Sequence, residues 1–352
     1  MQNLGSAEQS STPVSGKRHR KLIIGICLAV ILLIAAAAFW LFSNYIFVCG
    51  SFYHKGEDID LRGKDISIEQ YQVAASAYPQ LHIYWDIPIG GKRYDCSAES
   101  IAVGNFSMEE VPNFALFDDL KAVDGSDASC YDALAALREA MPGVRVSWVV
   151  RIGGEEFPDD ATEIVVNGSA TCALLSDLLP YLPALERVDL RNAALEPENA
   201  AELLEAAFPD VEFIYNIEVC GQKFSNDASG ISLPGADEAQ LAALCAAAKR
   251  FFHVETIDLG DTLYTVEDII ALRRAFDGAK VLCRLCIYGV ETPSDTDELD
   301  LSEAETGDGA DIGKAAAAMA DLKTIIVRSE LSDEDLEGLN RKYPGIEIIR
   351  AE

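Results

Sequence analysis

The chain has 352 residues, of which 49% are hydrophobic, and a formal net charge of −30 at pH 7. The charge is uneven, because residues 1–21 hold four Lys and Arg residues against one Glu and sum to +3, which leaves −33 for the remainder. Such an acidic surface repels nucleic-acid phosphates and anionic lipid headgroups, so we expect neither as a partner. The hydrophobic content is ample for a large folded core.

A charge-free apolar segment follows a basic cluster near the N-terminus. Residues 22–42 contain no charged side chain and would span roughly 32 Å as a helix, against about 30 Å for the hydrocarbon core of a bilayer. The preceding basic residues favour a cytoplasmic N-terminus. We therefore predict a cytoplasmic basic tail (residues 1–21), a transmembrane helix in contact with the lipid bilayer (22–42), a juxtamembrane linker (43–57) and an extracytoplasmic domain (58–352).

Two alternatives to an uncleaved anchor remain open. A cleaved signal peptide has an apolar stretch of only about 7–15 residues before a site of small residues, and residues 35–38 could supply that site, although Phe39–Phe42 continue the apolar run. A lipoprotein could be attached through Cys49, but Ile46-Phe47-Val48 lack the small residue expected before a lipidated cysteine. The sequence favours a single-pass membrane protein.

One sequence pattern recurs along the rest of the chain. It consists of an apolar strand with Asp, then a helix with apolar periodicity, then an aromatic residue or Met that is usually followed by Pro. Its closing positions are residues 79, 142, 209, 277 and 344, which lie 63, 67, 68 and 67 residues apart. A fixed period of this size is typical of a repeat array. We count about four repeats of about 67 residues.

The repeat is clearest around residues 188–276. Residues 211–219 alternate as a strand and a turn follows at Cys220-Gly221, at the place that Gly90-Gly91 and Gly153-Gly154 hold in other copies. An Ala- and Leu-rich pattern predicts a helix over residues 237–250, and Thr265 caps a second helix. Alternating strands and helices with short links predict right-handed crossovers and a parallel sheet. The predicted fold class is therefore an α/β solenoid, with strands on one face and helices on the other.

The segments 188–192, 201–204, 208–213 and 219–221 carry a resemblance to a known group. Together they resemble the leucine-rich-repeat-like ectodomains of membrane-anchored surface proteins from clostridial-type Gram-positive bacteria, over about residues 55–352. The resemblance implies a leucine-rich-repeat-like solenoid at the cell surface, and it supplies no catalytic residues. The chain departs from the standard leucine-rich repeat, whose units are only about 20–29 residues long and carry a regular Asn.

No catalytic, cofactor or metal site is predicted. The four histidines (His19, His54, His82 and His253) have no metal-ligand spacing among them, and the chain has no Gly-x-Ser-x-Gly elbow. Glycine pairs such as Gly153-Gly154 precede extended residues, so we interpret them as turns rather than phosphate loops.

Nine cysteines are present, one of them in the membrane segment. The other eight do not recur at equivalent repeat positions, so we expect most to be buried free thiols, with one or two disulfides still open. Cys283 and Cys286 should point to opposite faces of one strand, too far apart to bond.

The densest acidic stretch, residues 295–311, is expected to be a solvated loop, because its spacing does not match an EF-hand; a calcium site there stays open.

We expect a non-enzymatic module that binds a protein or a cell-envelope polymer, because solenoids present long concave faces suited to large ligands. The alternatives are a structural spacer or assembly subunit of an envelope complex, and an envelope hydrolase. Strand residues that point outward form the expected contact surface, although the aspartates could simply solvate the sheet. These residues are Asp60, Arg62, Asp189, Arg191 and Asp258.

Overall fold

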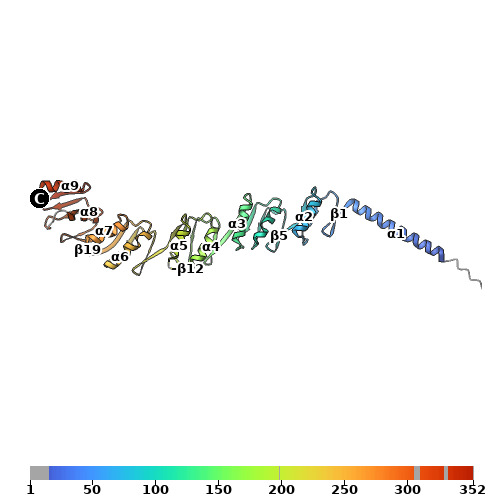
Figure 1. Cartoon of the computed structure of the whole chain (residues 1–352), viewed down its shortest axis with the longest axis horizontal. Coiled ribbons are helices and arrows are strands. Elements are labelled where there is room, and N and C mark those ends of the chain that lie inside the picture. Colours follow the sequence, from blue (N-terminus) through green and yellow to red (C-terminus); the bar gives the residue numbers. More distant parts are fainter. Residues whose placement is uncertain (1–15, 198, 305–309, 329–331, 352) are drawn as a thin grey trace, which may run out of the picture. The chain divides into compact units, whose positions relative to one another are not determined.

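The structure is a computed structural model that describes residues 16–197, 199–304, 310–328 and 332–351 (Figure 1). It is a mixed α/β protein with one N-terminal apolar helix. The chain divides into two compact units, Met1–Val149 and Val150–Glu352.

The first unit begins with helix α1 (Gly16–Asn44). Its segment Ile24–Asn44 is 21 residues long and apolar enough to cross a membrane, and by length and composition it could be either an anchor or a signal sequence. The helix starts earlier than predicted, so the basic residues 17–21 belong to it rather than to a tail.

The predicted juxtamembrane linker over residues 43–57 is instead an antiparallel hairpin of β1 (Tyr45–Val48) and β2 (Ser51–His54). The hydroxyl of Tyr53 donates a hydrogen bond to the carbonyl oxygen of Asp60 at 2.7 Å. Lys64 Nζ in turn donates to that hydroxyl at 2.8 Å. The hairpin is therefore attached to the strand that follows it.

The remainder of the first unit contains parallel strands joined by helices. A capping box between Ser67 and Gln70 satisfies backbone N–H groups at the start of α2. Pro112 lies inside η1, which is a 3₁₀ rather than an α-helix. The elements are β3 (Ile59–Asp60), α2 (Ile68–Ala77), β4 (Ile83–Tyr84), β5 (Asp86–Ile89), β6 (Lys92–Asp95), β7 (Ser100–Ala102), η1 (Met108–Leu116), β8 (Ala122–Gly125), α3 (Tyr131–Ala140) and β9 (Arg145–Ile152), whose last residues enter the second unit.

Among its described residues, the second unit contains four sheets whose parallel strands follow chain order and are joined by helices. The predicted strand over residues 211–219, the helix over 237–250 and the Thr265 cap are confirmed, with a capping box at the starts of both α6 and α7. The strands are β10 (Glu155–Pro158), β11 (Glu163–Val165), β12 (Gly168–Thr171), β13 (Arg187–Asp189), β14 (Ala193–Glu196), β15 (Glu212–Ile214), β16 (Asn216–Val219), β17 (Gln222–Ser225), β18 (Gly230–Ser232), β19 (Thr256–Tyr264), β20 (Lys280–Ile287), β21 (Val290–Pro293), β22 (Glu298–Asp300), β23 (Thr324–Val327) and β24 (Glu347–Arg350). The helices are α4 (Cys172–Leu178), η2 (Leu179–Tyr181), α5 (Ala200–Ala207), α6 (Glu238–Ala247), η3 (Ala248–Arg250), α7 (Val266–Ala275), α8 (Ala310–Ala318) and α9 (Asp333–Lys342).

Helices of the second unit contact one another beyond the limits of single sheets. Helix α7 contacts both α6 and α8. Arg273 Nη1 donates to the carbonyl oxygen of Ala317 at 2.6 Å, and Lys314 pairs with Glu267 at 3.0 Å. The helix layer is therefore shared between the sheet of β18–β21 and the sheet of β22–β24.

Five hairpin turns have a positive φ at both central residues, the geometry that matches the twist of two paired strands. Glycine holds both positions in two of them. At Gly90, with φ +56°, a Cβ would also lie 2.4 Å from the carbonyl oxygen of Asn105, so only glycine fits there. The turn pairs are Cys49-Gly50, Gly90-Gly91, Gly153-Gly154, Cys220-Gly221 and Tyr288-Gly289.

The parallel strands do not form the one continuous sheet that the repeat pattern predicts. Among the described residues they lie in separate sheets of two or three parallel strands. The hairpins explain the division, because an antiparallel return strand pairs with the edge that the next parallel strand would need. Strand β21, for example, pairs with β20, and β22 then starts another sheet.

In four hairpins, the residue directly after the return strand is buried and has a side chain with a polar atom or a thiol. This residue lies five positions after the second residue of the turn. In the second unit, Asn226 accepts from the backbone N–H of Tyr215 at 3.0 Å and donates to the carbonyl oxygen of Phe213 at 2.8 Å. Ser294 does the same for residues 283 and 281, at 2.9 and 2.6 Å. These side chains satisfy backbone groups where the third parallel strand bends into the hairpin. The four residues are Cys96, Asp159, Asn226 and Ser294.

Candidate binding groove

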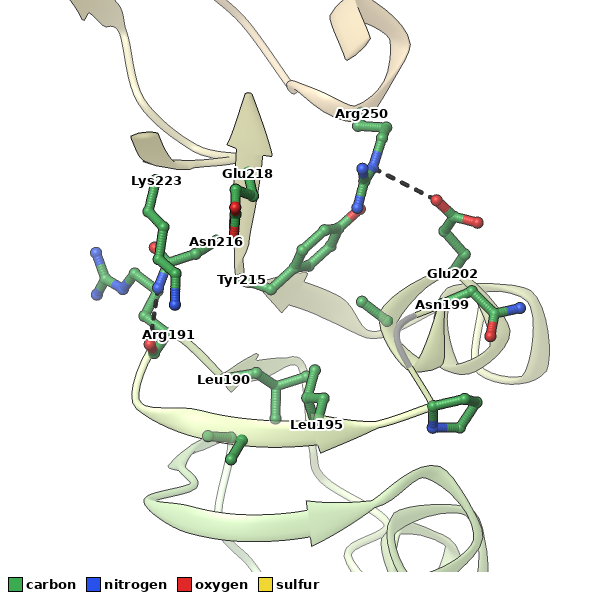
Figure 2. Close-up of a pocket in the computed structure, with 14 residues that line it drawn as sticks. Leu190, Arg191, Leu195, Asn199, Glu202, Tyr215, Asn216, Glu218, Lys223 and Arg250 are labelled. Carbon is green, nitrogen blue, oxygen red and sulfur yellow. Dashed lines mark hydrogen bonds and ion pairs between the residues drawn. The ribbon is translucent and has the colours of Figure 1, made fainter. Parts of the chain in front are cut away.

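A cavity of about 760 Å³ lies in the second unit, beside β14, α5 and the β16–β17 hairpin (Figure 2). Strand β14 and helix α5 build one wall of the cavity. The lining residues are Leu190, Arg191, Ala193, Ala194, Leu195, Pro197, Asn199, Ala201, Glu202, Tyr215, Asn216, Glu218, Lys223 and Arg250.

Tyr215 lies at the centre of the groove and is 3% exposed. Burial raises the pKa of its phenol, and the neighbouring Glu205 carboxylate adds to the effect. The guanidinium of Arg250 lies 5.9 Å from the centre of the Tyr215 ring and 3.4 Å from Glu202. The Tyr215 ring is thus held in place by packing, close to the ion pair of Arg250 and Glu202.

The opposite side of the groove is formed by Arg191 and the β16–β17 hairpin (Figure 2). Asn216 Nδ2 donates to the carbonyl oxygen of Arg191 at 2.8 Å, which ties the loop after β13 to β16. Glu218 and Lys223 are direct cross-strand partners, and both are exposed. Within the described chain, Lys223 forms no ion pair, so its ammonium group is free to bind a ligand.

The groove combines three cationic side chains with two carboxylates and an amide-bearing wall. This mixture suits ligands that carry carboxylates, hydroxyls or peptide groups, which need paired donors and acceptors. Its described lining includes no His, Cys, Ser or Asp.

The recurring aspartates have a local structural role. Each accepts a hydrogen bond from the backbone N–H two residues later, which is an Asx turn. Strands β3, β13 and β22 end at these aspartates, whereas β19 continues past Asp258 with a shift in register. The distance is 3.0 Å for Asp60 and Asp189 and 2.9 Å for Asp258. Asp124 and Asp300 make the same bond, each at 2.9 Å.

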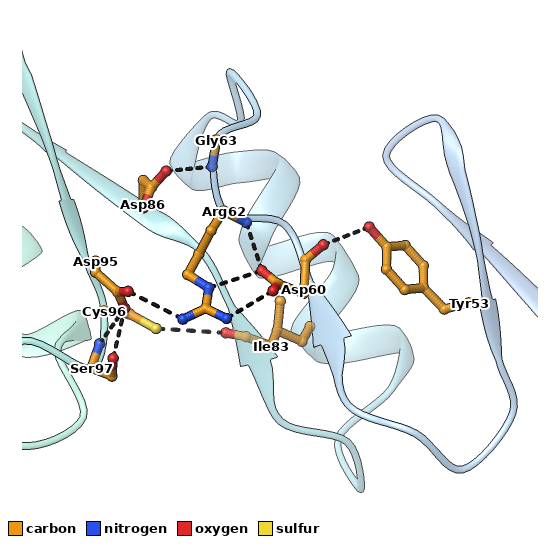
Figure 3. A network of polar contacts seen from close by, with 9 residues as sticks. All are labelled: Tyr53, Asp60, Arg62, Gly63, Ile83, Asp86, Asp95, Cys96 and Ser97. Atoms are coloured by element: carbon orange, nitrogen blue, oxygen red, sulfur yellow. Dashed lines mark hydrogen bonds and ion pairs between the residues drawn. The ribbon is translucent and has the colours of Figure 1, made fainter.

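Two of these aspartates also hold an arginine. In the first unit, Arg62 donates to both carboxylate oxygens of Asp60 and reaches Asp95 at 3.3 Å (Figure 3). These bonds lower the pKa of Asp60 to about 2. In the second unit, the Arg191–Asp189 pair closes at 2.6 Å and likewise lowers the pKa of Asp189.

Of the five residues expected to form a contact surface, only Arg191 lines the groove. The others lie at strand ends, in Asx turns or ion pairs. Sequence reasoning missed Tyr215, Lys223 and Arg250, because the groove joins elements that are distant in the chain. Their charge and aromatic character gave no separate signal.

The cysteines differ from the expectation that most are buried. All nine are free, so no disulfide forms, but only Cys96 and Cys283 are buried outside the membrane segment. Cys286 is exposed on the opposite face of β20 from Cys283, as predicted. Cys49 and Cys220 do occupy equivalent positions, because both stand first in a hairpin turn.

The acidic stretch 295–311 is only partly described, since residues 305–309 and the side chain of Asp311 lie outside the described residues. In its described part, Asp300 accepts a hydrogen bond from the backbone N–H of Ser302, and Asp297 forms an ion pair with Lys323 at 3.6 Å. These carboxylates do not converge on one another as calcium ligands.

No protein-family profile matches the chain, and none of the curated proteins matches it.

Proposed function

We propose that this chain is a membrane-anchored, single-pass, non-enzymatic binding protein, with its N-terminus in the cytoplasm. The support for the anchor is the apolar span of α1 directly after a basic cluster, which by the distribution of charge should stay on the cytoplasmic side. Residues beyond α1 would then fold outside the cytoplasm. The hairpin β1–β2 would lie at the membrane–water interface on the extracytoplasmic side, a position in which aromatic side chains are enriched.

The extracytoplasmic part is proposed to be a leucine-rich-repeat-like α/β solenoid. The support is the recurring order of parallel strand and helix, together with the contacts of α7 with both α6 and α8. In a solenoid each unit buries its apolar face on its neighbours, and large ligands bind along an extended surface. This surface is proposed to bind a protein or a cell-envelope polymer.

The groove around Tyr215 is the observation that carries the binding proposal. It is a cavity of about 760 Å³ with three cationic side chains, in a chain of net charge −30. Repulsion by the acidic surface disfavours anionic ligands elsewhere, so the ammonium group of Lys223, which forms no ion pair within the described chain, is the point where a carboxylate of a peptide or polymer would bind.

The test is a capture experiment with the full chain in detergent micelles. The protein would be incubated with the envelope fraction of its own source, cross-linked, and the retained molecules identified. Lys223→Glu reverses the charge of a free groove cation without touching the core, so it should reduce retention of the specific ligand. The matched control is Lys92→Glu, because Lys92 is also exposed on a hairpin return strand but lies in the first unit.

Loss of retention in Lys223→Glu but not in Lys92→Glu supports the groove. Equal retention by all three proteins would place the ligand elsewhere and contradict the groove assignment. Recovery of the chain alone would favour an assembly subunit over a binding module.

A further inference from the structure

The first unit brings together three side chains of types that ligate metals. His82 Nε2 lies 3.2 Å from Asp118 Oδ2, and an imidazole nitrogen of His82, the Sγ of Cys96 and a carboxylate oxygen of Asp118 all lie within 4.8 Å of one another. His82 directly precedes β4, Cys96 follows the return strand β6, and Asp118 follows η1. Three chain segments therefore meet at one point, although no two of the residues have a motif spacing.

Cys96 occupies the bridging position that Asn226 and Ser294 hold in other hairpins. Those two side chains reach their backbone acceptors at 2.8 and 2.6 Å. The thiol of Cys96 lies 4.0 Å from the corresponding acceptor, the carbonyl oxygen of Ile83 (Figure 3), and a thiol is a weak donor. The bridging role explains a small polar residue here but gives no preference for cysteine.

The His82–Asp118 pair also has a counterpart. Lys280, the first residue of β20, directly precedes the bridged residue Val281, as His82 precedes Ile83, and it pairs with Asp321 at 2.6 Å. A lysine ammonium has no lone pair for a metal, whereas an imidazole has one. Compared with the β20 hairpin, this hairpin has exchanged Lys for His and Ser for Cys, and both exchanges introduce ligand atoms.

We infer that His82, Cys96 and Asp118 form a binding site for a single Zn²⁺ ion. Zinc prefers sulfur, nitrogen and oxygen ligands in a tetrahedron. Its bond lengths place ligand atoms roughly 3.3–3.8 Å apart, so the present separations need only side-chain adjustment. Binding would release the thiol proton of Cys96, and the thiolate and carboxylate would balance the charge of the ion.

The site has an exposed side and a buried floor. The side chains of His82 and Asp118 are 42% and 36% exposed, while Cys96 is 1% exposed. An ion could therefore enter from solvent, and its fourth position would remain open to water or to a ligand from another molecule. The bound ion would link β4, the β5–β6 hairpin and the segment after η1, and so stabilise the first unit.

The experiment uses Co²⁺ as a spectroscopic substitute, with the full chain in detergent micelles under a non-chelating reductant. We expect one equivalent of Co²⁺ per chain to produce a thiolate-to-cobalt charge-transfer band and the visible bands of a tetrahedral ion. One equivalent of Zn²⁺ should then abolish both. Absence of a charge-transfer band in the wild-type chain would overturn the proposal.

Variants assign the ligands. Cys96→Asn places the residue found at position 226 in the same bridging role, so it should fold and lose the charge-transfer band. His82→Gln retains a polar side chain but loses the imidazole ligand, so it should weaken Co²⁺ binding by more than about tenfold. Tenfold is about the lower limit of the loss seen when a residue that only supports a metal ligand is removed. Controls are Cys286→Ser and His253→Gln, since these residues are exposed and lie outside the cluster.

A band that persists in Cys96→Asn, or is lost in Cys286→Ser, would show that the metal binds elsewhere and refute the site. The inference does not depend on the proposed binding function. A chain that binds zinc but retains no envelope ligand, or the reverse, would separate the two.

Discussion

Asn226 offers the sharpest test of how the hairpins are held to the sheets. The side chain has no exposed surface and makes two hydrogen bonds, one from the N–H of Tyr215 and one to the carbonyl oxygen of Phe213. Asn226→Ala would leave both backbone groups buried without partners. Each unsatisfied group costs about 1–3 kcal/mol, so we expect a loss of about 2–6 kcal/mol in local stability.

A graded variant and a control sharpen this prediction. Asn226→Ser should recover part of the loss, because Ser294 makes both equivalent bonds with a hydroxyl. Asn216→Ala is the control, since Asn216 is exposed and donates only one hydrogen bond, to the carbonyl oxygen of Arg191. Loss of a single exposed hydrogen bond should cost no more than about 1 kcal/mol.

Amide hydrogen exchange read by mass spectrometry suits a chain of several sheets, because it reports local opening. Peptides covering residues 211–226 should exchange faster in Asn226→Ala by about 30-fold or more, the factor that corresponds to 2 kcal/mol. Exchange no faster in Asn226→Ala than in Asn216→Ala would refute the bridging role. Far-UV circular dichroism would verify that all variants retain their secondary structure.

Three other perturbations have expected outcomes. Gly90→Ala should lower thermal stability more than Gly91→Ala, because only the former Cβ meets a neighbouring carbonyl oxygen, at 2.4 Å, while both residues have positive φ; equal melting temperatures would contradict this. Arg62→Ala should raise the pKa of Asp60 from about 2 toward its ordinary value in a carboxyl NMR titration. Because that pKa is lowered in the folded state, the ion pair stabilises the fold above about pH 4 and is lost as the pH falls toward 2, so the variant and wild type should converge in acid. Leu32→Arg at the centre of α1 should release the chain from membranes in carbonate extraction, since a central Arg costs about 2.5–3.5 kcal/mol; full retention would argue against a spanning helix.

The secondary structure was largely predictable from the sequence, because the signals are local. Alternation predicted the strand over residues 211–219, and Thr265 marked the start of α7 by a capping box that the structure contains. The first hairpin was missed for an equally local reason. Residues 43–57 were predicted to be a linker because they follow the membrane segment, although Cys49-Gly50 has the same turn character as Cys220-Gly221.

Sheet pairing and the candidate sites were not predictable in this way. The turn glycines predicted hairpins, and the pairing of β21 with β20 confirms one of them at Gly289. Whether these hairpins end the parallel sheet or join it depends on tertiary packing, which the local pattern does not contain. The groove depends on Arg250 meeting Tyr215 across 35 residues of chain, and the metal-ligand cluster spans residues 82–118. Spacing rules cannot find ligands that only the fold brings together.

The position after each return strand suggests how one fold can hold different chemistry. Its backbone requirement is the same in the hairpins that Asn226 and Ser294 close: a small buried side chain that accepts one N–H and donates to one carbonyl. Several polar residue types meet that requirement, so substitution there need not disturb the strands. The bridged carbonyl belongs to the residue directly after His82 in the first unit and directly after Lys280 in the second, so a cysteine at the bridging position lies close to that preceding side chain. Within the described chain, His82, Cys96 and Asp118 are the one group in which the bridging residue and its neighbours offer three metal-ligand atoms close together.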